Sequence, residues 1–244
     1  MKRLRILTLI LLILSVGAFF ATNALRRLRA DSTLPQISCG DDVLYLSVED
    51  GRDAMLQGMN AWDGKDGDLT GDIVVERVSG GEEKGQLTVS YAVADSDRHV
   101  AGYTRTVVYT DYRSPQFYLS KPLRYGIGED IQVRDRLGAL DQIDGTISDR
   151  IKVSTDSLQT YYAGLYPVTV EVTNSLGDTA SLTLDIEIYD SIFGEPVIQL
   201  DRYLVYLDSA AGFDPDSYIS SVTGAPESSV RVSTPAGGLR PGVN

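Results

Sequence analysis

The clearest candidate for ligand chemistry in this sequence is a cluster of four aspartates, Asp63, Asp66, Asp68 and Asp72. Calcium takes about six to eight oxygen ligands, and acidic loops of extracellular β-domains can supply them. The spacing is not that of an EF-hand, because Lys65 replaces a ligand and no Glu follows at the required distance. The alternative is a tight turn at Asp66-Gly67, flanked by carboxylates that accept backbone N–H groups. We favour the turn, and calorimetry with millimolar calcium tests the calcium site.

The remaining reactive residues do not form a catalytic set. The single histidine, His99, lies in a turn beginning at Asp95, and we interpret it as a solvated loop residue. The single cysteine, Cys39, excludes an internal disulfide and a multi-cysteine metal site. We expect Cys39 to be a small buried side chain, with an intermolecular disulfide as the alternative. The sequence therefore predicts no enzyme, no catalytic residues and no cofactor, apart from the calcium alternative.

Aromatic side chains offer a second possible ligand, a carbohydrate. The single tryptophan, Trp62, corresponds to Leu140 in the repetition described below, so we expect it to fill a core or loop-packing position. The better candidates for exposed sugar contacts are Tyr161, Tyr162, Tyr203 and Tyr206.

An N-terminal segment predicts a membrane helix. An uncharged stretch of 20 residues, 6–25, follows Lys2, Arg3 and Arg5 and precedes Arg26, Arg27 and Arg29. At about 1.5 Å per residue this length matches a hydrocarbon core of about 30 Å. A cleaved signal sequence is the alternative. We favour the uncleaved anchor, because basic residues follow the apolar stretch at once.

The charge of the chain separates this segment from the rest. The 244 residues have a formal charge of −12, with 34 acidic and 22 basic side chains. Residues 1–30 hold six basic and no acidic side chains, so the remainder has a net charge of −18. Such a charge repels phosphate, which argues against nucleic-acid binding. Each flank of the apolar stretch has three basic residues, so the positive-inside rule does not orient the helix. We orient it instead by the composition of the remaining chain, which is that of an exported domain.

Beyond the anchor the sequence repeats with a period of about 80 residues. Segment 61–70 matches 139–148, and 85–93 matches 164–172. We predict an N-terminal anchor at 1–30, repeats at 31–111 and 112–192, and a partial third repeat at 193–244. The third copy ends where the first two begin their most regular strand, so we expect truncation or completion by a partner.

Each repeat is typical of a β-sandwich. Apolar residues alternate with polar ones, as in Leu87, Val89, Tyr91 and Val93, and this period of two predicts half-buried strands. Turn residues such as Asp66-Gly67 and Asp144-Gly145 separate the strands. The fold class is therefore all-β, with tandem immunoglobulin-like antiparallel sandwiches after one helix. Arg105 stands where Leu184 faces inward, which predicts a bulge or an edge strand at that position.

The pattern Ala-x-Asp-x-x-Asp-Gly-(Asp/Thr)-(Leu/Ile)-(Thr/Ser), followed by Gly-x-x-x-Val-x-Tyr-x-Val-x-Asp-Ser, resembles the bacterial surface immunoglobulin-like repeat. That family, long a domain of unknown function, also occurs in some pesticidal crystal proteins. The resemblance covers nearly all of residues 34–244, and it implies an exported protein in which the repeats are stalks, spacers or adhesive modules.

These observations together predict a non-enzymatic, membrane-anchored cell-envelope protein whose extracellular repeats act as a stalk or adhesion module. It would be secreted if the N-terminal segment is cleaved. One alternative is the spacer of a larger surface enzyme with its catalytic domain beyond residue 244. Another is a module that binds a glycan, calcium or a cell-surface protein directly.

Overall fold

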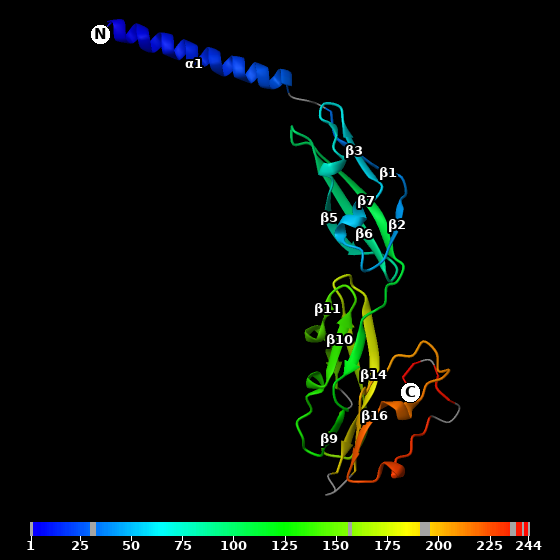
Figure 1. Ribbon diagram of the computed structural model, residues 1–244. Helices are drawn as coiled ribbons and strands as arrows, with labels where there is room; N and C mark the ends of the chain where they lie inside the picture. The colour runs from blue at the N-terminus through cyan, green and yellow to red at the C-terminus, as the bar shows by residue number, and fades with distance from the viewer. Residues whose placement is uncertain are drawn as a thin grey trace. The chain divides into compact units, whose positions relative to one another are not determined.

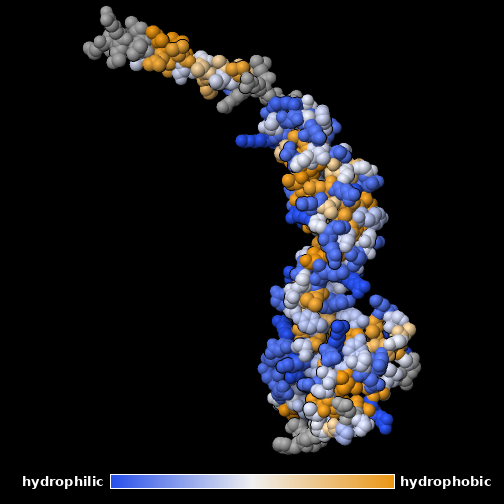
Figure 2. Space-filling model, viewed as in Figure 1, coloured by the Kyte–Doolittle hydropathy of each residue, from blue (hydrophilic) through white to orange (hydrophobic). Residues whose placement is uncertain are grey.

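The computed structural model describes residues 2–29, 33–155, 158–190, 196–234, 238–240 and 242–243. The chain begins with one long helix, α1, at Lys2–Arg29 (Figure 1). Its segment Thr8–Leu25 is long and apolar enough to cross a membrane, and none of that segment is buried. Figure 2 shows apolar side chains along the helix. A signal sequence near an N-terminus meets the same criterion of length and composition.

The rest of the chain is mainly β-structure in two compact units. The first unit comprises Met1–Leu44, Asp50–Val78 and Thr88–Val107. The second unit comprises Tyr45–Glu49, Ser79–Leu87 and Val108–Asn244. Residues 45–49 and 79–87 therefore belong with the second unit, although in sequence they lie within the first predicted repeat, 31–111.

Residues 36–109 form a three-stranded and a four-stranded sheet. The first has the order β1-β3-β4 and the second β2-β7-β6-β5. Their strands are β1 Gln36–Cys39, β2 Val43–Leu46, β3 Met59–Asp63, β4 Gly67–Asp68, β5 Val74–Gly80, β6 Gln86–Ala94 and β7 Val100–Tyr109. Two 3₁₀ turns connect them, η1 at Arg52–Leu56 and η2 at Thr70–Asp72.

Residues 116–189 form the same elements in the same order. The sheets are β8-β10-β11 and β9-β14-β13-β12. Their strands are β8 Gln116–Leu119, β9 Arg124–Gly126, β10 Leu137–Asp141, β11 Gly145–Thr146, β12 Lys152–Ser154, β13 Gly164–Thr173 and β14 Thr179–Tyr189, with η3 at Val133–Asp135 and η4 at Ser148–Arg150. Strands β13 and β14 pair antiparallel over ten residue pairs, whereas β9 pairs with β14 in parallel.

The remaining described residues form a smaller sheet of β15 (Val197–Leu200) and β16 (Ile219–Thr223), paired antiparallel. A short 3₁₀ turn, η5 (Pro215–Tyr218), directly precedes β16, and a second one, η6 (Glu227–Ser229), follows it. The segment 230–232, which corresponds in sequence to 151–153, is not a strand. Most of the linker at 190–195 lies outside the described residues.

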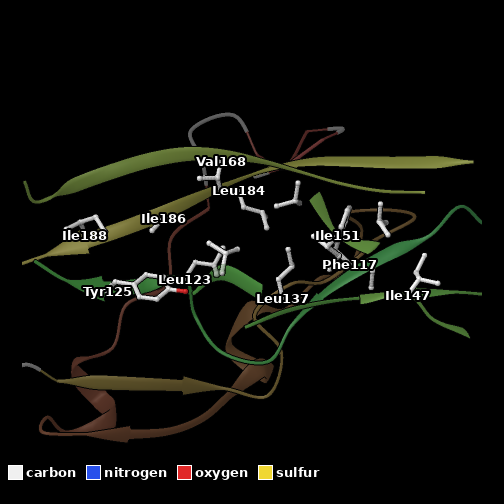
Figure 3. Packing of buried hydrophobic residues seen from close by; sticks show 14 residues of the cluster. Phe117, Leu123, Tyr125, Leu137, Ile147, Ile151, Val168, Leu184, Ile186 and Ile188 are labelled. Atoms are coloured by element: carbon white, nitrogen blue, oxygen red, sulfur yellow. The ribbon is translucent and has the colours of Figure 1, made fainter. Parts of the chain in front are cut away.

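Inward-facing side chains of both sheets form the core of residues 116–189 (Figure 3). Phe117, Leu137 and Ala139 come from the three-stranded sheet, and they pack in one cluster with Val168 and Ile186 from the four-stranded sheet. Burying one of the larger of these side chains, such as Phe117 or Leu137, stabilises the fold by about 1.5–3 kcal/mol. This arrangement is a sandwich of two sheets, as the period of two along the strands predicts.

The structure confirms the all-β fold class with one N-terminal apolar helix. On β6 the alternation is also confirmed, because Leu87, Val89, Tyr91 and Val93 are all buried.

Of the two alternatives predicted at Arg105, the edge strand is wrong, and the bulge stays a prediction. Strand β7 lies in the interior of its sheet, between β2 and β6, and Arg105 is only 4% exposed on it. Its guanidinium reaches the Gln57 carbonyl at 2.6 Å, so a backbone acceptor compensates for part of the cost of burial.

Candidate functional site

The four aspartates that suggested calcium follow one another along the chain but lie in different elements. Asp63 ends β3, Asp66 lies in the turn to β4, Asp68 is the last residue of β4 and Asp72 is in η2. Asp63 is 1% exposed. Its Oδ1 accepts hydrogen bonds from the backbone N–H groups of Lys65 at 2.8 Å and Asp66 at 3.1 Å. Thr33 Oγ1 donates to its Oδ2 at 3.3 Å. The buried carboxylate therefore closes the turn, and Gly67 completes it at a φ of 79° that favours glycine.

The next two aspartates of the cluster also accept hydrogen bonds from the protein, Asp66 from the turn after β6 and Asp68 from a residue two positions ahead. Asp66 accepts hydrogen bonds from the Ser96 backbone N–H and hydroxyl, both at 2.8 Å. Asp68 accepts from the Thr70 N–H at 2.9 Å. Hydrogen bonds from the Thr70 side chain and then its backbone lower the pKa of Asp68, which keeps this carboxyl ionised. Asp72 is exposed in η2.

The second unit repeats this geometry and so explains the sequence motif. Asp141 Oδ1 accepts from the N–H groups of Ile143 and Asp144, each at 2.9 Å. Asp144 in turn accepts from the Ser175 N–H and hydroxyl at 2.7 and 2.6 Å. Burial tends to raise the pKa of Asp144, but the Ser175 hydrogen bonds and then Arg150 lower it. The Asp-x-x-Asp-Gly motif is thus a hydrogen-bonded turn.

The last polar residue of the motif has a role in the same turn. The Ala61 N–H donates to Thr70 Oγ1 at 3.1 Å, and the Ala139 N–H donates to Ser148 Oγ at 3.0 Å. Within the described part of the chain, no group of three or more His, Cys, Asp or Glu side chains is arranged to hold a metal ion. Calcium binding at Asp63, Asp66, Asp68 and Asp72 stays a prediction for calorimetry.

His99 and Cys39 both lie in the first unit. His99 Nδ1 lies 2.6 Å from Asp95 Oδ2, and the His99 N–H donates to Asp95 Oδ1 at 2.7 Å. The histidine is thus held against a buried carboxylate at the β6–β7 turn. Cys39 is half-buried rather than fully buried, and its Sγ lies 3.0 Å from the Asp41 carbonyl.

Sequence patterns did not predict a polar network in the second unit. Asn174 Nδ2 donates to Asp141 Oδ2 at 3.1 Å and to the Tyr112 hydroxyl at 2.9 Å. The Tyr112 hydroxyl donates to Asp178 Oδ2 at 2.8 Å, and Lys84 Nζ lies 2.9 Å from Asp178 Oδ1. Asn174 and Asp178 stand where the first repeat has Asp95 and His99. This difference between the repeats is the sequence feature that could have indicated the network.

Two pKa values reflect this network. Burial tends to raise the pKa of Asp178, but hydrogen bonds from Ser114, Lys84 and Tyr112 together lower it. Burial, followed by the Asp178 carboxylate, raises the pKa of Tyr112 well above its usual range. Tyr112 therefore remains a hydrogen-bond donor to an ionised Asp178 at neutral pH.

The prediction that Trp62 fills a core or packing position is wrong, because its side chain is 63% exposed. On β3 the buried positions are Met59, Ala61 and Asp63, so Trp62 points to the outer face of the sheet. Tyr161 and Tyr162 are exposed, as predicted. Tyr206 is about half-exposed, and its hydroxyl accepts a hydrogen bond from the Phe117 N–H at 3.0 Å.

No family model and no curated protein matches this chain. Among solved structures it is similar to CBM51-2 in complex with GlcNAc and INT domains from Clostridium perfringens ZmpB. That match has 18% identity and a TM-score of 0.27, and covers 61% of this chain and 26% of the other. The M60 catalytic domain with the CBM51-1 and CBM51-2 domains of the same protein has 11% identity and a TM-score of 0.27, covering 70% and 33% of the two chains.

A third match is the extracellular cadherin domains 1–4 of protocadherin gamma B7. It has 14% identity and a TM-score of 0.22, and covers 70% of this chain and 55% of the other. The chain therefore spans about a quarter to a half of the length of these structures. At such TM-scores the matches do not indicate a function.

Proposed function

We propose that this chain is a non-enzymatic, membrane-anchored surface protein whose β-modules act as a stalk or adhesion module. The proposal rests chiefly on the helical segment Thr8–Leu25, which is apolar and unburied and precedes a chain of β-structure. Its 18 residues extend about 27 Å at 1.5 Å per residue, close to the thickness of a hydrocarbon core.

The charge distribution supports an exposed position for the β-modules. Six basic side chains, three on each side of the apolar stretch, suit the two interfaces of a bilayer. The remainder of the chain has a net charge of −18, which keeps a surface domain soluble and away from anionic lipid headgroups.

The repetition supports a modular stalk. The two β-regions share one order of elements, one sheet order and one hydrogen-bonded Asp-x-x-Asp-Gly turn. We infer that residues 31–111 and 112–192 are copies of one immunoglobulin-like module, with residues 193–244 as part of a third. The resemblance to the bacterial surface immunoglobulin-like repeat adds the expectation that such copies act as spacers or adhesive modules.

The test is membrane retention of the full chain with a C-terminal epitope in a bacterial host. We expect the chain to stay in the membrane pellet after alkaline carbonate washing, with an intact N-terminus by mass spectrometry. When the outer layers of the cells have been permeabilised so that an added protease reaches the membrane surface, that protease should remove the epitope. Val16→Arg places a charge near the helix centre at a cost of about 2.5–3.5 kcal/mol and should release the chain, whereas Val16→Leu should not.

Two results would overturn the anchor. Release of the uncleaved wild-type chain by carbonate would show that α1 does not span the bilayer. Cleavage near Ala24, followed by recovery of the chain in the medium, would show that the segment is a secretion signal.

A further inference from the structure

The outer face of the sheet β1-β3-β4 presents one tryptophan among polar side chains. We call this surface the Trp62 face and define it by its five exposed residues, Gln36, Ser38, Asn60, Trp62 and Asp68. In the strand register Trp62 lies opposite Gln36 on one side and Asp68 on the other, and Ser38 lies opposite Asn60. Since directly paired residues point to the same side of a sheet, the five side chains share one surface.

The indole is positioned for contact with a ligand. It is 63% exposed, and its Cη2 lies 3.8 Å from the point where a Gly67 side chain would begin. The ring therefore reaches along the sheet towards β4, over a residue with no side chain. An aromatic side chain can bury about 150–250 Å² of surface, and most of the Trp62 surface remains in contact with water here.

Polar groups around the ring are available. Among the described residues, the Trp62 indole N–H, the Gln36 amide and the Ser38 hydroxyl make no hydrogen bond. Asn60 makes a single long contact, 3.4 Å from its Nδ2 to the Gly58 carbonyl. Asp68 is held by Thr70 as an ionised acceptor. The ring thus has, in the described part of the chain, donors and acceptors without partners on its β1 side, and on its β4 side a carboxylate that already accepts from Thr70.

This arrangement points to a specific class of ligand. A hexopyranose with equatorial substituents has an apolar C–H face that stacks on an aromatic ring and a rim of hydroxyls that bond to amides and carboxylates. A phosphate-bearing ligand or an acidic sugar would meet the Asp68 carboxylate within a domain of strong negative charge. A protein partner ordinarily needs about 800 Å² on each side with a central apolar cluster, whereas Trp62 is the one large apolar side chain of this face.

We propose that the Trp62 face binds neutral, equatorially substituted glycans through a sugar ring stacked on Trp62. The inference rests on the proposed function, because a cell-surface position exposes the face to glycans.

The second unit provides an internal comparison. The corresponding positions hold Leu140 in place of Trp62 and Thr146 in place of Asp68. The ring of Tyr118 occupies the space that a Gly138 side chain would need, so it is packed within its own sheet. The proposal therefore assigns the glycan site to the first unit alone.

The test uses the full chain in non-denaturing detergent micelles and two probes, cellotetraose and chitotetraose. Because Trp62 is the single tryptophan, its fluorescence reports binding at the proposed site directly. We expect a saturable change in emission with at least one probe. By isothermal titration calorimetry, Trp62→Ala should weaken binding by at least about tenfold, whereas Trp62→Tyr should retain part of it. Gln36→Leu should weaken binding several-fold, and Leu140→Ala should leave it unchanged.

Thermal melts establish that each variant is folded. The absence of a saturable change with either probe up to about 10 mM, or binding that survives in folded Trp62→Ala, would overturn the glycan site. Carbonate extraction of membranes from cells that express the same variants, before any detergent is added, separates this result from the proposed function, because a chain that binds no glycan can still be retained in the membrane.

Discussion

Replacing Asp63 by alanine should destabilise the first unit through loss of a buried turn, with no involvement of metal. The Asp63 carboxylate accepts two backbone N–H bonds at 2.8 and 3.1 Å and one hydroxyl bond at 3.3 Å. Hydrogen bonds to an ionised group contribute about 1.5–3 kcal/mol each. Lys65 and Asp66 are exposed, so water can replace part of this loss. We expect Asp63→Ala to lower the free energy of unfolding by about 2–4 kcal/mol.

Two further variants separate the turn from a calcium site. Asp63→Asn keeps an acceptor oxygen for the two N–H groups, so it should cost only about 1 kcal/mol. Asp72→Ala removes the same charge from an exposed side chain that makes no hydrogen bond among the described residues, and it should change stability by less than about 0.5 kcal/mol.

The assay is urea unfolding of the full chain in micelles, followed by the emission of Trp62, which adjoins the turn and is the single tryptophan. For a unit of about 80 residues, a loss of 2–4 kcal/mol also lowers Tm by roughly 10–25 °C. The reasoning would be refuted if Asp63→Ala unfolded within error of the wild type. It would also be refuted if millimolar calcium stabilised the wild type and Asp72→Ala abolished that effect.

Three other predictions concern single residues. The folded pKa of Asp178 lies below its unfolded value of about 3.9, so the stabilisation by this carboxylate is present above that pH and is lost as the pH falls through the folded pKa. Thermal melts at decreasing pH, followed by circular dichroism, should therefore show a smaller fall in Tm for Asp178→Asn than for the wild type. Gly80→Ala places a Cβ that clashes with the Leu176 carbonyl oxygen and should destabilise the second unit by at least about 1 kcal/mol in thermal melts, whereas Gly71→Ala, which meets open space, should not. Arg105→Leu should match or exceed wild-type stability in urea, because it removes a buried guanidinium whose Nε has no partner among the described residues, and a strong loss of stability would contradict this.

Strand patterns predicted the fold well where apolar residues alternate without exception. Val168, Val170 and Val172 on β13 are all buried, and the polar residues between them face outward or lie half-buried. A period of two is a direct consequence of strand geometry, so no long-range information is needed to recognise it. The turn at Asp66-Gly67 was predicted for the same reason, since a glycine at positive φ is a local requirement.

Prediction from the sequence pattern failed where a polar residue faces inward. On β3 the inward positions end with Asp63, whose carboxylate is buried because it bonds to two backbone N–H groups of its own turn. The correspondence of Trp62 with Leu140 predicted a core or loop-packing position, but Leu140 is itself exposed, so this comparison missed the exposed face. Arg105 is a similar case, because the Gln57 carbonyl, which compensates for part of the cost of its burial, is distant in sequence.

The parallel pairing of β9 with β14 has a mechanical consequence. The Glu187 N–H donates to the Leu123 carbonyl, just before β9, and the Ile127 N–H, just after β9, donates to the Tyr189 carbonyl, both at 2.9 Å. Tension that pulls β9 and β14 in opposite directions along their axes loads these bonds together in shear, whereas a hairpin pulled from its open end breaks its bonds one at a time. Single-molecule stretching of the full chain should therefore show a higher unfolding force than a proline variant at Glu187, which removes one of the two donors. A module linked in series on a cell surface would resist extension at this short strand before its core is exposed to water.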